Sequence, residues 1–172
     1  MLPTPVNLAT AAANVVAMVF GDGLADLRPV PRTLIDSGPR RSVYRLTSDA
    51  VADGPPVLLV PPLAAPALCF DLRRGCSLAE HLVGQGRRAY LVDYGTIAFA
   101  DRGLGIEHWV DDVLPRAIMA ASADAGDQPV HLVGWCLGGI FALLATADRA
   151  DLPVASITAV ASPIDFTAIP LV

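Results

Sequence analysis

The stretch Val130-His131-Leu132-Val133-Gly134-Trp135-Cys136-Leu137-Gly138-Gly139 decides the fold that we expect for this chain. Its first residues form a short apolar run typical of a buried strand, and the apolar residues from Leu137 to Thr146 predict a helix. Cys136 stands in the turn between them, and the flanking glycines allow strand and helix to approach closely. We therefore interpret the stretch as a nucleophile elbow of the form G-x-C-x-G, with Cys136 as the nucleophile.

The elbow gives the cysteine a chemical setting. The helix N-terminus places backbone N–H groups and a positive dipole end beside the sulfur, which favours the thiolate and any oxyanion that it creates. Two other interpretations stand beside this one. A free cysteine is commonly a small buried hydrophobe, and a glycine-rich turn before a helix can bind phosphate. Against phosphate, the sequence has no GxxxxGK[ST] motif and no basic residue beside the turn.

The composition favours one well-packed domain. The chain has 172 residues, of which 53% are hydrophobic and 17% charged, enough for a full core. Its net charge is -5 and all 12 basic residues are arginines without a basic run, so nucleic-acid binding is not expected. Cys69, Cys76 and Cys136 form neither a disulfide framework nor a zinc motif, and no metal is expected. This cysteine usage fits a reducing, intracellular setting.

The N-terminal part, residues 1–41, is predicted to be a helix and a linker. The helix covers residues 5–20, an apolar segment that we expect to be amphipathic or partly buried, packing on a partner. No basic residue precedes it, since the first is Arg28, so the basic region of a secretory signal is missing. The segment is also too short and too rich in alanine for a membrane span. Glycines and prolines from Gly21 to Arg41 predict an extended linker.

Residues 42–172 are predicted to form the folded domain. The alternating pattern of residues 42–46 is typical of a half-buried edge strand, and the continuous apolar run of residues 57–60 suits a strand buried on both faces. Ser77 and Glu80 form a capping box before a helix that ends at Gly84 or Gly86. The further elements are strands at 88–92, 130–134 and 155–161 and helices at 107–123 and 137–146. This alternation predicts a doubly wound, mostly parallel α/β sheet with right-handed crossovers.

The chain offers no convincing base for Cys136 among its three histidines. His131 precedes the cysteine on the same strand, at a distance of about 16 Å in extended geometry. His81 lies in the middle of a predicted helix that runs away from the site. His108 opens a helix, where the dipole disfavours the imidazolium that a base must become.

The acids that follow the elbow do not complete the site either. Asp148 and Asp151 fall at the far end of the helix that leaves the elbow, and Asp165 suits a pocket or loop position better than a triad acid. No histidine follows Cys136. We therefore expect the chain to carry the nucleophile half of an active site and to be inactive alone.

The oxyanion hole can be placed on two backbone donors. One is the N–H of Leu137, the residue after the nucleophile, and the other comes from the loop that follows the strand at residues 57–60. That loop is Pro61-Pro62-Leu63-Ala64-Ala65-Pro66, and its prolines have no N–H. The donor is therefore Leu63 or Ala64, and we favour Leu63.

These motifs together resemble the poly(3-hydroxyalkanoate) synthases of the α/β-hydrolase superfamily. The resemblance runs from about Tyr44 to Phe166 and rests on four pieces. They are residues 57–63, residues 70–73 with 77–78 and 82–83, residues 86–93, and Gly134-Trp135-Cys136-Leu137-Gly138-Gly139. Ser162-Pro163-Ile164-Asp165-Phe166 is also similar to a segment of that family. The chain departs from the family at Ala65-Pro66, usually Asn and a basic residue, and at Asp93-Tyr94-Gly95, usually a Trp-Arg-Asn-Pro-like turn.

The resemblance implies an α/β-hydrolase-type domain, of which residues 42–172 are the N-terminal portion. The C-terminal part with the acid and the histidine is missing. It also implies ping-pong transfer of 3-hydroxyacyl groups from coenzyme A thioesters through Cys136, with no cofactor. The implied partners are the acyl-CoA, the growing polyester chain, and either a second copy of the chain or another subunit. The implied location is the cytoplasm, free or on polyester granules.

Two alternatives stay open. The first is a cysteine α/β-hydrolase: a protein similar to the dienelactone hydrolases, or a thioesterase or esterase. The dienelactone hydrolases share a G-x-C-x-G-G elbow, but they carry a glutamate at the upstream strand end where this chain has Pro61-Pro62. The chain could otherwise be a non-catalytic partner subunit of a heteromer.

A sheet that ends at the strand of residues 155–161 leaves a bare apolar edge, and such edges recruit partners or aggregate. We therefore expect the 172-residue chain to be oligomeric or poorly soluble. Light scattering checks this, and a stable monomer would contradict it.

Overall fold

The protein is built on a six-stranded sheet with the strand order β1-β2-β6-β3-β7-β8. The computed structural model describes residues 5–21, 23–47, 52–165 and 167. The sheet consists of β1 (Arg32–Gly38), β2 (Arg41–Leu46), β3 (Pro56–Val60), β6 (Arg88–Asp93), β7 (Val130–Trp135) and β8 (Val154–Val160). A small second sheet pairs β4 (Asp71–Arg73) with β5 (Cys76–Ser77).

The strands β6, β3, β7 and β8 are parallel, whereas β1 and β2 are added antiparallel at the β6 side. The helices are α1 (Pro5–Phe20), α2 (Leu78–Gly84), α3 (Leu114–Asp124) and α4 (Leu137–Asp148). Shorter turns are the 3-10 segments η1 (Ala67–Phe70) and η2 (Phe99–Asp101) and the π-helical segment η3 (His108–Val113). This mostly parallel sheet with covering helices confirms the predicted fold class.

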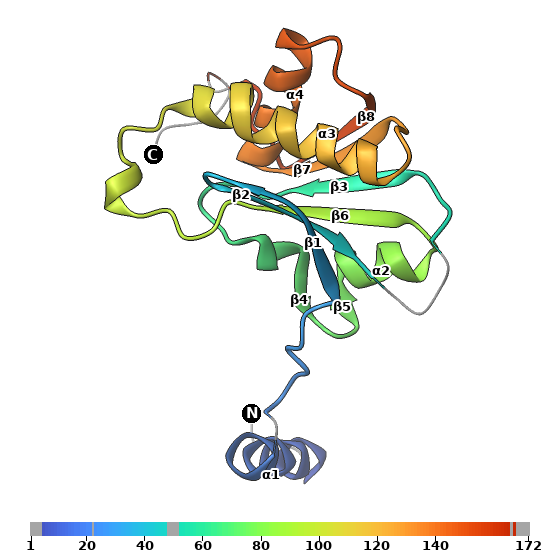
Figure 1. Ribbon diagram of the computed structural model, residues 1–172. Helices are drawn as coiled ribbons and strands as arrows, with labels where there is room; N and C mark the ends of the chain where they lie inside the picture. The colour runs from blue at the N-terminus through green and yellow to red at the C-terminus, as the bar shows by residue number, and fades with distance from the viewer. Residues whose placement is uncertain (1–4, 22, 48–51, 166, 168–172) are drawn as a thin grey trace.

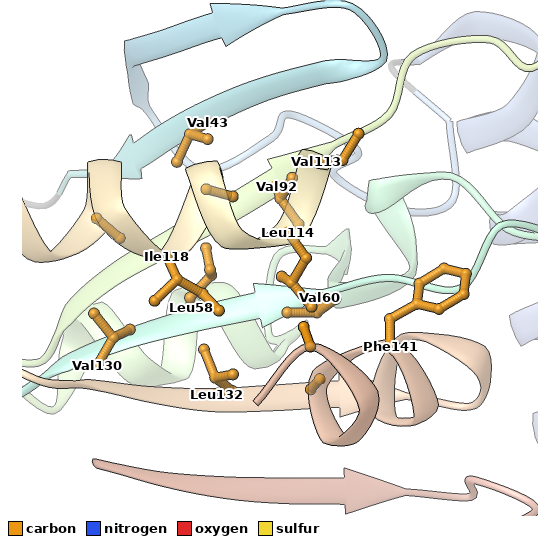
Figure 2. Close-up of a cluster of buried hydrophobic side chains, with 14 of the residues drawn as sticks. Val43, Leu58, Val60, Val92, Val113, Leu114, Ile118, Val130, Leu132 and Phe141 are labelled. Atoms are coloured by element: carbon orange, nitrogen blue, oxygen red, sulfur yellow. The ribbon is translucent and has the colours of Figure 1, made fainter. Parts of the chain in front are cut away.

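Helices cover both faces of the sheet, as Figure 1 shows, with α3 and α4 on one face and α2 on the other. The strand β3 is buried along its whole length because both faces are covered. Alternate residues of the central strands therefore enter two separate cores. The larger core, on the α3 and α4 face, contains the side chains labelled in Figure 2: Val43, Leu58, Val60, Val92, Val113, Leu114, Ile118, Val130, Leu132 and Phe141.

The smaller core lies on the opposite face and joins α2 and η1 to the sheet. Its members are Val30, Leu46, Leu59, Ala67, Phe70, Ala79, Val83, Ala89 and Leu91. The helix α2 begins as predicted, with the Ser77 hydroxyl accepting the N–H of Glu80. The second half of the expected capping box differs, because the Glu80 carboxylate accepts the N–H of Gly75 instead.

The linker expected over residues 21–41 is wrong for residues 32–38, which form the strand β1. Consequently β2 is an internal strand between β1 and β6, and the edge position predicted for residues 42–46 is also wrong. The strand β1 could not be predicted from the sequence because its buried and exposed residues do not alternate, and because it carries a bulge between Leu34 and Asp36. Arg41 holds the hairpin by donating from Nε to Asp36 at 2.6 Å.

The helix predicted at residues 107–123 is present but begins with a π-helical segment. The N–H of Leu114 bonds to the carbonyl of Trp109, five residues back. Pro115 follows at the start of α3 and has no N–H to offer to an α-helical bond. The wider π-helical turn therefore accommodates Pro115, because no α-helical hydrogen bond is required from the missing N–H.

The helix α1 has the predicted bounds but is not buried against the rest of the described chain. Its side chains at Val15, Val16, Met18 and Val19 are all more than half exposed, and that of Phe20 is 85% exposed. In Figure 1 it lies apart from the sheet, beyond β1. Among the described residues, no helix combines the length and the apolar character that crossing a bilayer requires.

Replacing Ile118 tests the larger core. Ile118 is fully buried under the sheet, so Ile118→Ala should lower the free energy of unfolding by about 2–5 kcal/mol. The neighbouring Met119 is 51% exposed and provides the matched control. Met119→Ala should change stability by less than about 0.5 kcal/mol. Urea denaturation measures both values, and equal losses would contradict the assignment of the core.

Candidate active site

The candidate site lies where β3 and β7 end side by side. Val60 pairs with Gly134 in parallel register, so the loop after β3 and the turn after β7 leave the sheet together. The chain passes from β3 to β6 on one side and then to β7 on the other, so the strand order reverses here. In open α/β sheets such a reversal, at the carboxyl ends of the strands, is where ligands bind.

The turn after β7 has the backbone geometry of a nucleophile elbow. Cys136 has φ 53° and ψ −118°, a conformation that a non-glycine residue rarely adopts. A Cβ added at Gly134 would lie 2.5 Å from the Cα of Gly139, so the strand and helix touch through bare backbone. The close approach that the sequence predicted is therefore present. Cys136 is half-buried and carries a free thiol.

The first turn of α4 also contacts the end of β3. A Cβ added at Gly138 would lie 2.2 Å from the carbonyl oxygen of Val60 and 2.7 Å from that of Pro61. This contact seats the N-terminus of α4 against the loop that contains Leu63. Leu63 and Leu137, the two predicted oxyanion donors, line the same hollow of about 340 Å³.

The hollow beside these two leucines is largely apolar. Its other walls come from the segment after β6, from η3 and from α4: Ile97, Ala98, Asp101, Arg102, Leu104, Gly105, Ile106, Trp109 and Phe141. The rings of Trp109 and Phe141 stack with centroids 6.3 Å apart and planes 12° from parallel. Trp109 is 3% exposed, and its indole N–H finds no acceptor among the described residues.

A second hollow, of about 440 Å³, adjoins the first at Leu63 and Ile97. Ala64, the other donor considered, lines this one. Its walls are residues 63–67 and 93–97, the two loops after β3 and β6. Both departures from the synthase pattern, Ala65-Pro66 and Asp93-Tyr94-Gly95, therefore face one cavity.

Tyr94 is the buried polar residue of this second hollow. Its side chain is 5% exposed and its hydroxyl has no hydrogen-bond partner among the described residues. Burial, with a smaller contribution from Cys69, raises the pKa of Tyr94 far above its usual value. The hydroxyl therefore stays protonated and can act as a donor.

Both backbone groups of Cys136, its N–H and its carbonyl, form hydrogen bonds that the sequence did not predict. Its N–H donates to the carbonyl of Val160 at 2.8 Å, across to the end of β8. Its carbonyl accepts the N–H of Gly139 at 3.1 Å and the hydroxyl of Ser162 at 2.8 Å. Sequence analysis missed Ser162 as a partner of the elbow, although it did single out the segment that begins with it.

The three histidines lie on the elements that the sequence predicted for them: His81 on α2, His108 at the start of η3 and His131 on β7. His131 shares a 2.8 Å hydrogen bond with the hydroxyl of Ser156, and His81 is exposed on α2. His108 packs edge-on against Trp109, with centroids 5.2 Å apart. Within the described residues, no imidazole hydrogen-bonds to Cys136.

The acids after the elbow are engaged elsewhere. Asp148 is the last residue of α4, and Asp151 pairs with Arg149 at 2.6 Å. The hydrogen bond from Arg149 holds the pKa of Asp151 below its usual range. Asp165 accepts from the N–H and the hydroxyl of Thr167. The described part of the chain contains no cluster of three or more His, Cys, Asp or Glu side chains that could hold a metal ion.

Residues 55–171 match the family model of the alpha/beta hydrolase fold. The match covers well over half of the chain, so the protein belongs to the α/β-hydrolase fold family. The solved structure of the lip1 protein of Acinetobacter baumannii covers 100% of this chain, and the match takes in 51% of its own chain, with a TM-score of 0.61. At 18% identity this likeness is one of fold alone.

Five curated proteins match, each named Poly(3-hydroxyalkanoate) polymerase subunit PhaC, which confirms the resemblance drawn from the motifs. The Cupriavidus necator protein is 31% identical over 114 residues, 64% of this chain and 19% of its own length. The Allochromatium vinosum protein is 27% identical over 160 residues, 86% of this chain and 44% of its own. The chain thus spans less than half the length of these relatives.

Substituting Gly138 tests the contact between α4 and the end of β3. Gly138→Ala would press a methyl group into backbone oxygens that cannot rotate away, so we expect a loss of about 1–3 kcal/mol in unfolding free energy. Gly84, in α2, has nothing within 4 Å of an added Cβ. Gly84→Ala should be neutral or stabilise the protein by up to about 1 kcal/mol. If urea denaturation gave both variants the same stability, the contact would be refuted.

Proposed function

We propose that this domain provides the cysteine nucleophile and the oxyanion hole of an acyltransferase that moves 3-hydroxyacyl groups from coenzyme A thioesters. The observation that carries the proposal is the elbow: Cys136 in a strained turn, with Leu63 and Leu137 lining one hollow beside it. The common name of the five curated relatives supplies the substrate class.

The setting of Cys136 supports nucleophilic chemistry. The sulfur stands at the N-terminus of the 12-residue helix α4, where unpaired N–H groups and the helix dipole favour negative charge. The N–H groups of Leu63 and Leu137 are our candidates for holding the oxyanion as it develops on the substrate carbonyl. The apolar hollow that they line suits an acyl chain, since its walls are mainly leucine, isoleucine and aromatic side chains.

The reaction proceeds in two transfers. The Cys136 thiolate attacks the thioester carbonyl carbon, and collapse of the tetrahedral intermediate breaks the bond to the coenzyme A sulfur, which leaves as a thiolate and takes up a proton. In the second transfer a hydroxyl group attacks the acyl-cysteine and gives its proton to a base. The Cys136 thiolate is released and the acyl group now sits in an ester.

The described residues show no base for the thiol, because none of His81, His108 and His131 hydrogen-bonds to Cys136 there. We propose that it is an imidazole supplied by further polypeptide, either another subunit or a longer form of the chain. The growing polyester is then the second substrate, and association with polyester granules in the cytoplasm follows from the same proposal. No cofactor enters this chemistry.

Trapping the acyl-enzyme tests the nucleophile. The first transfer needs only the Cys136 thiolate, so the purified chain should complete this half of the reaction although it cannot turn over without the base. Incubated with 3-hydroxybutyryl coenzyme A, it should keep the mass of one hydroxyacyl group on the peptide that contains Cys136. Cys136→Ala should lower the rate of acylation by about 10³-fold or more, because nothing replaces the nucleophile. Cys76→Ala is the matched control, since Cys76 is an exposed thiol away from the elbow, and it should acylate normally.

Acylation that persists in Cys136→Ala would refute the proposal. Once the base is supplied by the further polypeptide, the product of the second transfer separates two outcomes. Ester products indicate transfer to a hydroxyl, whereas free hydroxyacid alone would indicate a cysteine hydrolase that uses the same elbow. Transfer and hydrolysis need to be compared because the chain departs from the synthase pattern in two loops, and these loops form the walls of the second hollow.

A further inference from the structure

The end of β8 forms a sharp turn directly beside the elbow. Ala161 follows the last residue of β8 with φ 49°, a positive φ like that of Cys136 at the end of the neighbouring β7. This left-handed residue separates Val160, whose carbonyl accepts the N–H of Cys136, from Ser162, whose hydroxyl donates to the carbonyl of Cys136. The turn thus forms hydrogen bonds with both the N–H and the carbonyl of Cys136.

Gly139 provides the space that the Ser162 hydroxyl needs. A Cβ added at Gly139 would lie 2.1 Å from the Ser162 Oγ, closer than any side chain could tolerate. The second glycine of the Gly138-Gly139 pair therefore has a separate role from the first. Gly138 admits the end of β3, and Gly139 admits Ser162.

The bond from Ser162 acts on the oxyanion donor through the peptide plane. The carbonyl of Cys136 and the N–H of Leu137 belong to one planar trans peptide group, so they point in opposite directions. Holding the carbonyl oxygen of Cys136 from one side fixes the direction of the Leu137 N–H on the other. A donor on the carbonyl also polarises the peptide group and strengthens its N–H as a donor.

We propose that Ser162 is a positioning residue that orients the Leu137 N–H toward the oxyanion by holding the carbonyl of Cys136. This inference rests on the proposed function, in which Cys136 is the nucleophile and the Leu137 N–H is an oxyanion donor. Its geometry is independent of the natural substrate, because any acyl donor that reacts with Cys136 forms an oxyanion in the same place.

The test compares two reactions of the Cys136 thiol. Acylation by p-nitrophenyl acetate passes through a tetrahedral oxyanion, whereas alkylation by iodoacetamide does not. In Ser162→Ala we expect the acylation rate at Cys136 to fall about tenfold, less than the loss of a whole oxyanion donor. The alkylation rate should stay within about twofold, since it needs no oxyanion donor. Both rates are followed by mass spectrometry of the peptide that contains Cys136.

Two further variants sharpen the comparison. Ser162→Thr keeps the hydroxyl and should restore most of the acylation rate. Ser156→Ala removes a serine within β8, whose hydroxyl bonds to His131 near the start of the strand, and should leave both rates unchanged. Amide hydrogen exchange at Gly139, which also bonds to the Cys136 carbonyl, reports whether the elbow itself has loosened.

The proposal is overturned if Ser162→Ala acylates like the unmodified chain, or if acylation and alkylation fall together. An equal effect of Ser156→Ala would also overturn it, because the serine would then act only through the stability of the strand. Failure of the proposed function gives a different result: the unmodified chain would react with p-nitrophenyl acetate in the Ser162-dependent way and yet not with 3-hydroxybutyryl coenzyme A.

Discussion

The candidate site depends on one constraint, the contact of bare backbone between the start of α4 and the ends of the neighbouring strands. Gly134, Gly138 and Gly139 each leave out a side chain that would strike a different neighbour: the helix, the end of β3, and Ser162 on the turn after β8. Packing at this distance forces Cys136 into its left-handed conformation. Strain of this kind persists only where the surroundings over-determine it, and here the surroundings are the two adjacent strands.

The same contact unites parts of the chain that are far apart in sequence. The loop at Leu63, the elbow at Cys136 and the turn at Ser162 come from three parallel strands that lie next to one another. In the proposed site the loop and the elbow contribute backbone N–H groups, and the turn after β8 contributes the Val160 carbonyl and the Ser162 hydroxyl that hold Cys136. Three buried polar groups of the long segment between β6 and α3 remain without partners among the described residues: the Tyr94 hydroxyl, the His108 Nε2 and the Trp109 indole N–H.

Local patterns predicted most of the fold, because the buried parallel strands and the amphipathic helices have strong periodic signals. The strand β1 was missed because edge strands are half-exposed and because a bulge interrupts its alternation. The elbow was predicted from spacing alone, since its glycines and cysteine are contiguous. Ser162 was not, because its bond to Cys136 spans 26 residues and depends on the turn at Ala161. Nothing in the sequence fixes that pairing before the strands are placed side by side.

The two edges of the sheet differ in what they permit. Along β1, the bulge, the neighbouring Pro31 and the charged residues Arg32 and Asp36 discourage pairing with another strand. Along β8 the sequence from Val154 to Val160 has no charge and no proline, and its one register shift lies at Ala155, near the start of the strand. Charge and proline therefore guard the β1 edge and are absent from the β8 edge. A strand added along β8 would lie beside the strand whose end bonds to both peptide groups of Cys136.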